Sequence, residues 1–286
     1  MLAPNTPVRI PAGLVVTVGF RHHARMQETL IHPSAVINPR ATLGARVSIG
    51  AYAVIGAGVE IGDDCDIGPH VVLSGPMVLG ARNRLSAHAT LGLAPQDNSY
   101  NDEPTRLEVG TDNIFREFVT IHRASTKEDG ITRIGNRNLL MAYSHVGHDG
   151  RLGDDITIAN ASQLAGHVHV QDRAYISALC GIHQFVHIGT LAMVGGGAVV
   201  TQDVAPFSMV AGNRARLRGL NTRGIERAGL DKPSSRCIRK AHTRIFRSGS
   251  TLADAIADLQ SDPAMALPEI KELIAFIQSS TRGIIR

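Results

Sequence analysis

The segment LMAYSHVGHDGRLGDDITIANASQLAGHVHVQDRAYISALCGIHQFV, residues 140–186, decides the fold. Within it an aliphatic residue recurs every six positions, in a register that begins at Ile134 and continues to Val200. The residue four positions after each aliphatic one is usually small. A period of six fits neither a heptad coiled coil nor a 3.6-residue surface helix, and it is typical of a parallel β-helix built from hexapeptide repeats.

The same repeat occupies Ile31 to Leu91 and resumes over Val109, Phe115 and Ile121, so that twenty-six hexad positions in all hold Ile, Leu, Val or one Phe. Two stretches interrupt it, APQDNSYNDEPTR at 94–106 and KEDGITR at 127–133. Because Val109 resumes the register eighteen residues after Leu91, we expect the first stretch to replace one coil with a projecting loop. Loops of that length without structure of their own are usually functional.

Three hexads make one triangular coil of eighteen residues, so residues eighteen apart stack about 4.8 Å from each other. We predict an all-β parallel β-helix over residues 28–221, followed by a C-terminal helical domain over residues 222–286. The repeat decays at Pro206 into an expected linker, AGNRARLRGLNTRG. The expected helical elements are an arm from about Ile225, a helix from Ser234 or Ser235 to near Gly249, and helices over 251–260 and 268–280.

Residues 1–27 carry no hexad, and we expect them to form a mobile extension, with Met26 as an alternative initiator. Their apolar run, residues 12–20, is too short to span a bilayer, and we expect no membrane span later in the chain. The three cysteines are far apart and form no CxxC motif. That usage favours a reducing compartment, and we expect the protein to be cytoplasmic.

The formal net charge of +4 comes entirely from the residues after 221, where eleven Lys and Arg face seven Asp and Glu. A charge asymmetry of this kind favours an acidic partner at the C-terminal end. One predicted helix carries five cations at spacings of three to four and no acid: Arg236, Arg239, Lys240, Arg244 and Arg247. Such a face is either a solvated helix surface or a docking site for an acidic carrier.

The eighteen-residue spacing of the coil predicts a cluster of histidines. It places His148 in one column with Gly166 and Gln184, and crowds His148, His167 and His183 at one edge. Asp149 follows His148 directly, and a carboxylate that holds an imidazole in one tautomer suits a general base. The backbone N–H of Gly166, with no side chain beside it, is placed to stabilise an oxyanion.

Three histidines also permit a metal site, as in the β-helical carbonic anhydrases, with His122, His145 and His148 as ligands. The stacked column of His148 provides no third nitrogen at that point. We therefore expect no metal. A base, an orienting carboxylate and a backbone donor, with no cysteine or serine nucleophile in line, favour direct attack of an acceptor hydroxyl on a carbonyl.

Several stretches resemble one family, the acyl-carrier-protein:UDP-N-acetylglucosamine O-acyltransferases that begin lipid A synthesis. They are QDNSYNDEPTRLEVG, FREFVTIHRAS, NLLMAYSHVGHD, LAGHVHV, IHQF, MVGGG, QDVAPFSMVAGN and STRGIIR. The resemblance covers residues 31–286 and includes both interruptions. It implies a left-handed coil, a homotrimer with active sites between subunits, acyl carrier protein as donor and UDP-N-acetylglucosamine as acceptor, without cofactor, nucleic acid or membrane span.

By this resemblance His148 is the general base, Asp149 orients it, and Gly166 donates to the oxyanion. The positions implied to line the nucleotide-sugar or acyl site are Asp97, His122, His145, His167, His183 and Gln184. Asn221 and Arg227 match positions near the donor and the phosphates, and Arg239, Lys240 and Arg244 become the carrier-docking residues. Gly196 matches the position that caps the acyl groove, so a 3-hydroxymyristoyl-length donor is expected. Ser99 stands where a lysine is common, and Arg223 where an acid is common.

Two rival functions remain for such a chain. The related N-acyltransferase of the same pathway carries an additional N-terminal uridine-binding domain, for which the residues before Ile31 are too few. A non-catalytic β-helical scaffold would have no need of His148, Asp149 and Gly166 together. An assay with both substrates separates the three possibilities.

Overall fold

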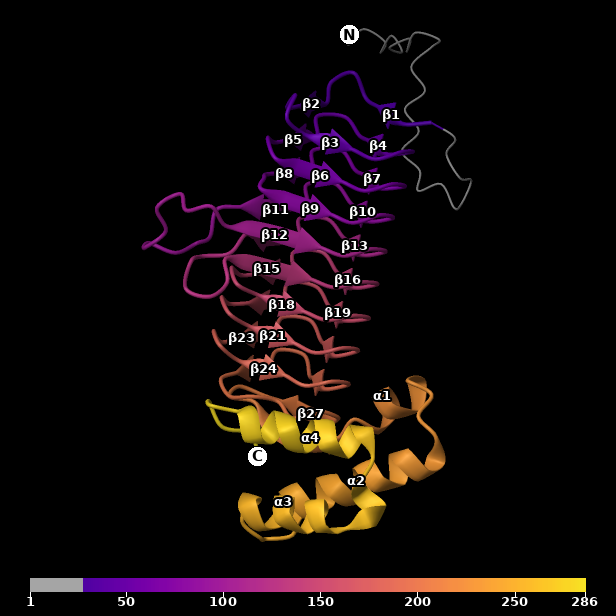
Figure 1. Ribbon diagram of the computed structural model, residues 1–286, viewed down its shortest axis with the longest axis vertical. Coiled ribbons are helices and arrows are strands. Elements are labelled where there is room, and N and C mark those ends of the chain that lie inside the picture. The colour runs from indigo at the N-terminus through magenta and orange to yellow at the C-terminus, as the bar shows by residue number, and fades with distance from the viewer. Residues whose placement is uncertain (1–27) are drawn as a thin grey trace, which may run out of the picture.

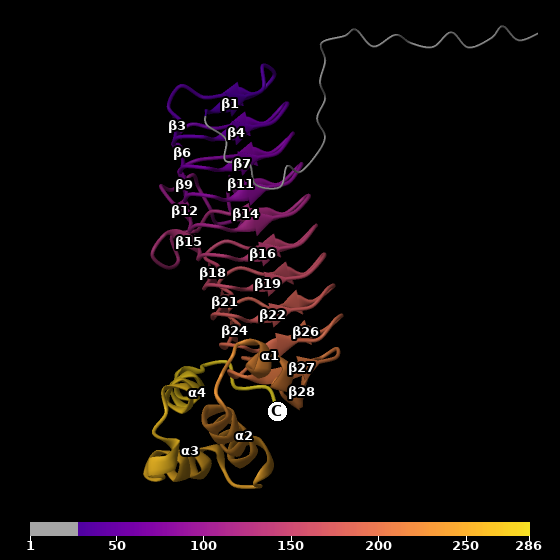
Figure 2. The same ribbon diagram turned by 90° about the vertical axis from the view of Figure 1, so that its right-hand side faces the viewer.

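The structure is a computed structural model, and it describes residues 28–286; the predictions for residues 1–27 fall outside that range. Short strands stack coil upon coil into a long column, and the helices pack at its C-terminal end (Figures 1 and 2). The chain folds as a left-handed parallel β-helix with a C-terminal helical region, as the hexad pattern and the resemblance predicted.

Three sheets form the three sides of the column, and nearly all of their strands run parallel. The first sheet contains β1 (Leu30–Ile31), β4 (Ser48–Ile49), β7 (Asp66–Ile67), β10 (Arg84–Leu85), β13 (Ile114–Phe115), β16 (Leu139–Leu140), β19 (Thr157–Ile158), β22 (Tyr175–Ile176), β25 (Met193–Val194), β27 (Ser208–Ala211) and β28 (Arg216–Leu220). The second contains β2 (Val36–Ile37), β5 (Val54–Ile55), β8 (Val72–Leu73), β11 (Thr90–Leu93), β14 (Thr120–His122), β17 (His145–Val146), β20 (Gln163–Leu164), β23 (Gly181–Ile182) and β26 (Val199–Val200). The third contains β3 (Thr42–Leu43), β6 (Val59–Ile61), β9 (Met77–Leu79), β12 (Arg106–Val109), β15 (Ile131–Ile134), β18 (Arg151–Leu152), β21 (His169–Val170) and β24 (His187–Ile188).

The hexad aliphatic residue is the inward-facing residue of each strand. From Ile49 to Val200 these side chains are nearly all buried, and they form one continuous core with the small hexad residues such as Cys65 and Cys180. Burying an aliphatic side chain contributes about 1.5–3 kcal/mol, so the ladder is the main source of stability. Many corners of the coil place a non-glycine residue in the left-handed region, with φ near 60°, among them Asp149 and His167.

The first interruption does not replace a coil, which corrects the expectation from the register. Val109 of β12 pairs with Leu79 of β9, thirty positions earlier instead of eighteen. The twelve residues 94–105, called here the first loop, are therefore an insertion into an otherwise complete coil. The next coil contains a smaller insertion, because Ile134 pairs with Val109 at a separation of twenty-five. Residues 123–130, called here the second loop, project from the same side of the column as the first (Figure 1).

The segment after Pro206 is not an irregular linker. Strand β27 adds in parallel to β25, and β28 then returns antiparallel to β27, which caps the last coil with a hairpin. The sequence 211–220 concealed this strand because its arginines alternate with residues that are only partly buried, so no hexad marks it.

Four α-helices follow: α1 (Thr222–Arg227), α2 (Lys232–Arg247), α3 (Leu252–Ser261) and α4 (Pro268–Ser279), with a 3₁₀ turn at Pro263–Met265. Helix α2 begins earlier than expected, because the Asp231 side chain accepts a hydrogen bond from Ser234 N at 2.7 Å and caps it there. The helices share a buried cluster with Leu191 and Phe207 of the last coil. The elements thus change type at residues 221/222, and the division into domains at that point stays a prediction. None of the helices in residues 28–286 combines the length and hydrophobicity that a bilayer crossing needs.

Candidate active site

A cavity of about 510 Å³ lies along the second sheet and the turns that follow its strands. Six residues of the predicted site share its wall with other residues: His122, His145, His148, Gly166, His183 and Gln184. These side chains come from successive coils, which is why positions eighteen or twenty-five apart in the chain converge on one cavity.

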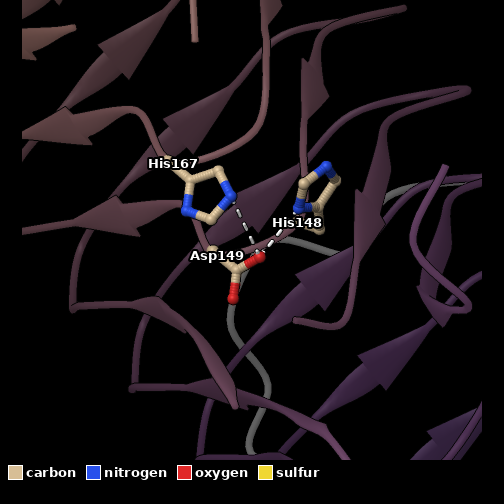
Figure 3. Close-up of side chains that lie close together, drawn as sticks. All are labelled: His148, Asp149 and His167. Atoms are coloured by element: carbon tan, nitrogen blue, oxygen red, sulfur yellow. Dashed lines mark hydrogen bonds and ion pairs between the residues drawn. The ribbon is translucent and has the colours of Figure 1, made fainter. Parts of the chain in front are cut away.

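His148 and Asp149 form a tight pair at this wall (Figure 3). Nδ1 of His148 lies 2.7 Å from Oδ2 of Asp149. The carboxylate is buried and also accepts from the backbone N–H and the hydroxyl of Ser125, the latter at 2.7 Å. Burial raises the pKa of the Asp149 carboxyl, but the hydrogen bonds from His148 and Ser125 outweigh burial, so that its pKa lies below the usual value. An ionised Asp149 holds the proton of His148 on Nδ1 and leaves Nε2 as the acceptor nitrogen.

Gly166 faces the His148 ring from the next coil. A Cβ added to Gly166 would lie 2.5 Å from Cε1 and 2.6 Å from Nε2 of His148, so only glycine leaves room for this ring position. The Gly166 carbonyl accepts from Phe185 N, whereas its N–H donates to no other described residue. A free backbone donor therefore lies beside the acceptor nitrogen of His148.

His122 and His145 meet edge to face, with ring centroids 5.0 Å apart. Burial, followed by the nearby histidines, lowers the pKa of His145 to about 4. Burial and His148 lower the pKa of His122 as well. Both rings are therefore neutral near pH 7, and Nδ1 of His122 is buried without a hydrogen-bond partner among the described residues.

Asp97 lies in the first loop, next to Gln96 of the cavity wall. Its carboxylate accepts from Ser99 N and Oγ, and it pairs with Lys127 of the second loop at 2.6 Å. The hydrogen bond from Lys127, followed by those from Ser99, holds the pKa of Asp97 well below its usual range. Ser99 thus donates hydrogen bonds to Asp97 but supplies no positive charge at this point. The positive charge beside Asp97 comes from Lys127 of the second loop.

Other predicted residues lie outside the cavity wall. His167 is buried behind Asp149, and Gly196 follows β25 with room for a Cβ, 3.6 Å from Ala178 O. Asn221 is buried and caps α1, donating to Leu191 O at 2.8 Å and accepting from Gly224 N. Arg227 is exposed in the last turn of α1.

The cations of α2 differ in what they contact. Arg239 and Lys240 are exposed, whereas Arg244 lies 3.3 Å from Asp262 and is partly neutralised. The predicted docking face therefore has two freely presented cations at its centre, and Arg244 is the weaker member.

His148, Asp149 and His167 each offer a ligand atom within 4.8 Å of the others, which is compatible with a metal ion. This set differs from the His122, His145 and His148 alternative of the sequence. The 2.7 Å contact from Nδ1 of His148 to the carboxylate has the length of a charge-assisted hydrogen bond, which explains that contact without an ion.

Several contacting residues were not among those predicted from the sequence. Ser125 and Glu128 of the second loop reach Asp149 and His167, and Gln163 and Thr201 line the cavity. The coil spacing would have found Gln163, because it pairs with His145 in adjacent strands. No spacing argument finds the loop residues.

Comparisons with known proteins agree on one family. A family model described as UDP N-acetylglucosamine O-acyltransferase, domain 2, matches residues 203–285, and a bacterial transferase hexapeptide model matches residues 41–75. The acyl-[acyl-carrier-protein]–UDP-N-acetylglucosamine O-acyltransferase of Alkalilimnicola ehrlichii is 46% identical over 198 residues, which cover 69% of this chain and 76% of the relative. The enzyme of the same name from Gloeothece citriformis is 46% identical over 211 residues, covering 74% of this chain and 75% of the relative.

Solved structures give the same result. The UDP-N-acetylglucosamine acyltransferase LpxA of Bacteroides fragilis superposes with a TM-score of 0.87 at 33% identity, covering 90% of this chain and all of that one. LpxA of Acinetobacter baumannii superposes with a TM-score of 0.87 at 38% identity, with the same coverage.

Proposed function

This chain belongs to the acyl-[acyl-carrier-protein]–UDP-N-acetylglucosamine O-acyltransferase family, and from that premise we propose that His148 is the general base of its reaction. The reaction moves an (R)-3-hydroxyacyl group from acyl carrier protein to the 3-hydroxyl of UDP-N-acetylglucosamine, the first step of lipid A biosynthesis. The observation that carries the proposal is the His148–Asp149 pair, held at 2.7 Å at the wall of a cavity large enough for a sugar.

In the proposed mechanism the 3-hydroxyl oxygen attacks the thioester carbonyl carbon, and Nε2 of His148 takes its proton. Asp149 keeps the other proton on Nδ1 and stabilises the imidazolium that forms. Collapse of the tetrahedral intermediate breaks the carbon–sulfur bond and releases the carrier thiolate. The thiolate takes the proton from His148, which restores the neutral base.

The negative oxygen of the intermediate needs a donor close to the base. We assign this role to the Gly166 N–H, since it is free and lies beside His148. The neutral His122 and His145, with His183 and Gln184, are proposed to bind the sugar and nucleotide, together with Asp97 at the loop. From the resemblance we propose that Gly196 contacts the acyl chain. On the same basis we propose that Asn221 and Arg227 lie near the donor and the phosphates.

We further propose a homotrimer in the cytoplasm. One corner of the column presents stacked, exposed rings, Tyr52, His70, His88, Phe118 and Tyr143, with centroids 4.8–5.2 Å apart. Three of these rings, Tyr52, Phe118 and Tyr143, are large exposed hydrophobic side chains, and such a stripe supports contact between subunits. The three free cysteines support a reducing compartment.

The carrier is proposed to dock on α2 through Arg239 and Lys240. Replacing both with Ala should raise the KM for the carrier-bound donor by roughly threefold to tenfold and weaken its salt dependence, because exposed charge pairs are individually weak and screened. The KM for UDP-N-acetylglucosamine should not change. Steady-state kinetics at two ionic strengths measure both values.

Arg244→Ala is the matched comparison on the same helix, and it should have a smaller effect because Asp262 already pairs with Arg244. An unchanged KM for the carrier-bound donor in the double variant would contradict docking here and show that this face is only a solvated helix surface.

The activity itself is tested by incubating the purified protein with 3-hydroxyacyl carrier protein and UDP-N-acetylglucosamine. We expect free carrier thiol and 3-O-acylated nucleotide sugar in equal amounts. Thiol release without sugar product would indicate hydrolysis and contradict the proposal.

A further inference from the structure

The second loop supplies a carboxylate that the mechanism above does not use. His167 is 3% exposed, and each of its ring nitrogens faces a carboxylate. Nδ1 lies 2.7 Å from Oε1 of Glu128, and Nε2 lies 3.6 Å from Oδ2 of Asp149 (Figure 3 shows the Asp149 contact). Glu128 is thereby joined through one imidazole to the carboxylate that orients His148.

The protons on His167 follow from these contacts. A neutral imidazole carries one N–H, and the nitrogen 2.7 Å from a carboxylate oxygen must be the one that donates. Nε2 would then direct a lone pair at the negative Asp149, which is repulsive in a buried site. Both contacts are attractive only when both nitrogens carry a proton and His167 is a cation between two carboxylates.

We propose that Glu128 is a positioning residue for acyl transfer: by holding His167 as a doubly protonated ring, it keeps Asp149 anionic and aligned with His148. The proposal rests on the role assigned to His148 above. Glu128 does not line the cavity, so it acts through His167 and Asp149 and not on the substrate.

The surroundings of His167 favour this arrangement. The ring of Phe185 stacks on it at 4.3 Å and excludes water, and the His148 ring meets it edge-on at 5.1 Å. Glu128 is itself held by Arg151 at 3.1 Å and lies 3.9 Å from Nε2 of His169. Burial, followed by the nearby His187, lowers the pKa of His169 to about 4 although Glu128 acts in the opposite direction. This ring is therefore neutral near pH 7 and does not compete for the Glu128 charge.

The neighbouring residue Asp129 provides a matched control. It is another acid of the same loop, but it pairs with Arg133 and with Arg151 and contacts neither His167 nor Asp149. Glu128→Gln and Asp129→Asn each remove one negative charge with almost no change of shape. Only the first removes the charge that faces His167.

The kinetic test compares these two variants. Glu128→Gln should lower kcat by roughly tenfold to a hundredfold, the loss seen when outer carboxylates that hold a functional imidazole are removed from metal sites. The KM for UDP-N-acetylglucosamine should stay near the wild-type value, because the cavity wall is unchanged. Asp129→Asn should keep the wild-type kcat. An equal loss of kcat in both variants would show that Glu128 only helps to stabilise the second loop, and it would overturn the proposal.

The spectroscopic test does not depend on activity. In protein labelled with ¹⁵N-histidine and assigned with His167→Gln, both nitrogens of wild-type His167 should resonate as protonated at neutral pH. In Glu128→Gln, Nδ1 should move to the unprotonated range, because the introduced amide can donate to it while Asp149 keeps the proton on Nε2. Asp129→Asn should leave both nitrogens protonated. A singly protonated His167 in the wild type, or a resonance that shifts when chelator is added, overturns the inference. An active His148→Ala would instead refute the base while leaving this test intact.

Discussion

His148→Ala should lower kcat by roughly 10²-fold to 10⁴-fold and leave the KM values little changed. In the proposed mechanism the imidazole of His148 takes the proton of the attacking hydroxyl in the transition state, and general bases contribute rate factors of that size. The protein should remain folded, since His148 is at the cavity wall while Val146 and Leu152 of the same coil fill the core. Steady-state kinetics on variant protein with wild-type circular dichroism provide the measurement.

Two comparisons separate a base from other roles for His148. Asp149→Asn should cost less than the loss of the ring, because it perturbs the tautomer and orientation of His148 but leaves the imidazole in place. Chelator should leave wild-type activity unchanged. Activity that is abolished by chelator and restored by Zn²⁺ would assign the His148, Asp149 and His167 cluster to a metal.

Gly166→Ala should lower kcat by about 10²-fold without preventing folding. The added Cβ would fall 2.5 Å from Cε1 of His148, so the ring must swing away from its position beside the proposed oxyanion donor. Misplacement of a catalytic group by about 1 Å costs a factor of that order. Kinetics, with a crystal structure of the variant to locate the ring, would test this expectation.

Gly181→Ala is the control for the added methyl group. Gly181 lies on the wall of the same cavity, but no atom lies within 4 Å of its added Cβ, so His148 does not have to move. This variant should keep its kcat even if a KM changes. A folded Gly166→Ala enzyme with wild-type kcat would show that the close approach of Gly166 to His148 has no catalytic importance.

The coil was predictable from the sequence because one physical constraint repeats along it. Each inward position must hold an aliphatic side chain, and the resulting period identifies the strands from Ile49 to Val200 almost individually. The same spacing brought Gly166 next to His148, which the structure bears out, with the positions eighteen apart in adjacent turns. Column spacing is therefore a reliable guide to side chains on the coil itself.

The loops and the C-terminal elements were less predictable. The second loop obeys no period, and its contacts from Ser125 and Glu128 depend on how it folds back over the coil. The expectation that the first loop replaces a coil was wrong. Its twelve inserted residues are two hexads long, so the period of six continues unchanged across the insertion. The start of α2 was missed because Ser234 and Ser235 are as suitable for an N-cap as Asp231, so the sequence offered several equivalent starting points.

In the proposed mechanism the sugar hydroxyl meets His148 in the cavity along the second sheet, and a crystal structure with bound UDP-N-acetylglucosamine would reveal that contact. In that structure we expect the 3-hydroxyl oxygen at about 2.6–3.2 Å from Nε2 of His148, the reach of a general base. A sugar bound with that hydroxyl turned away from His148, or bound outside this cavity, would contradict it.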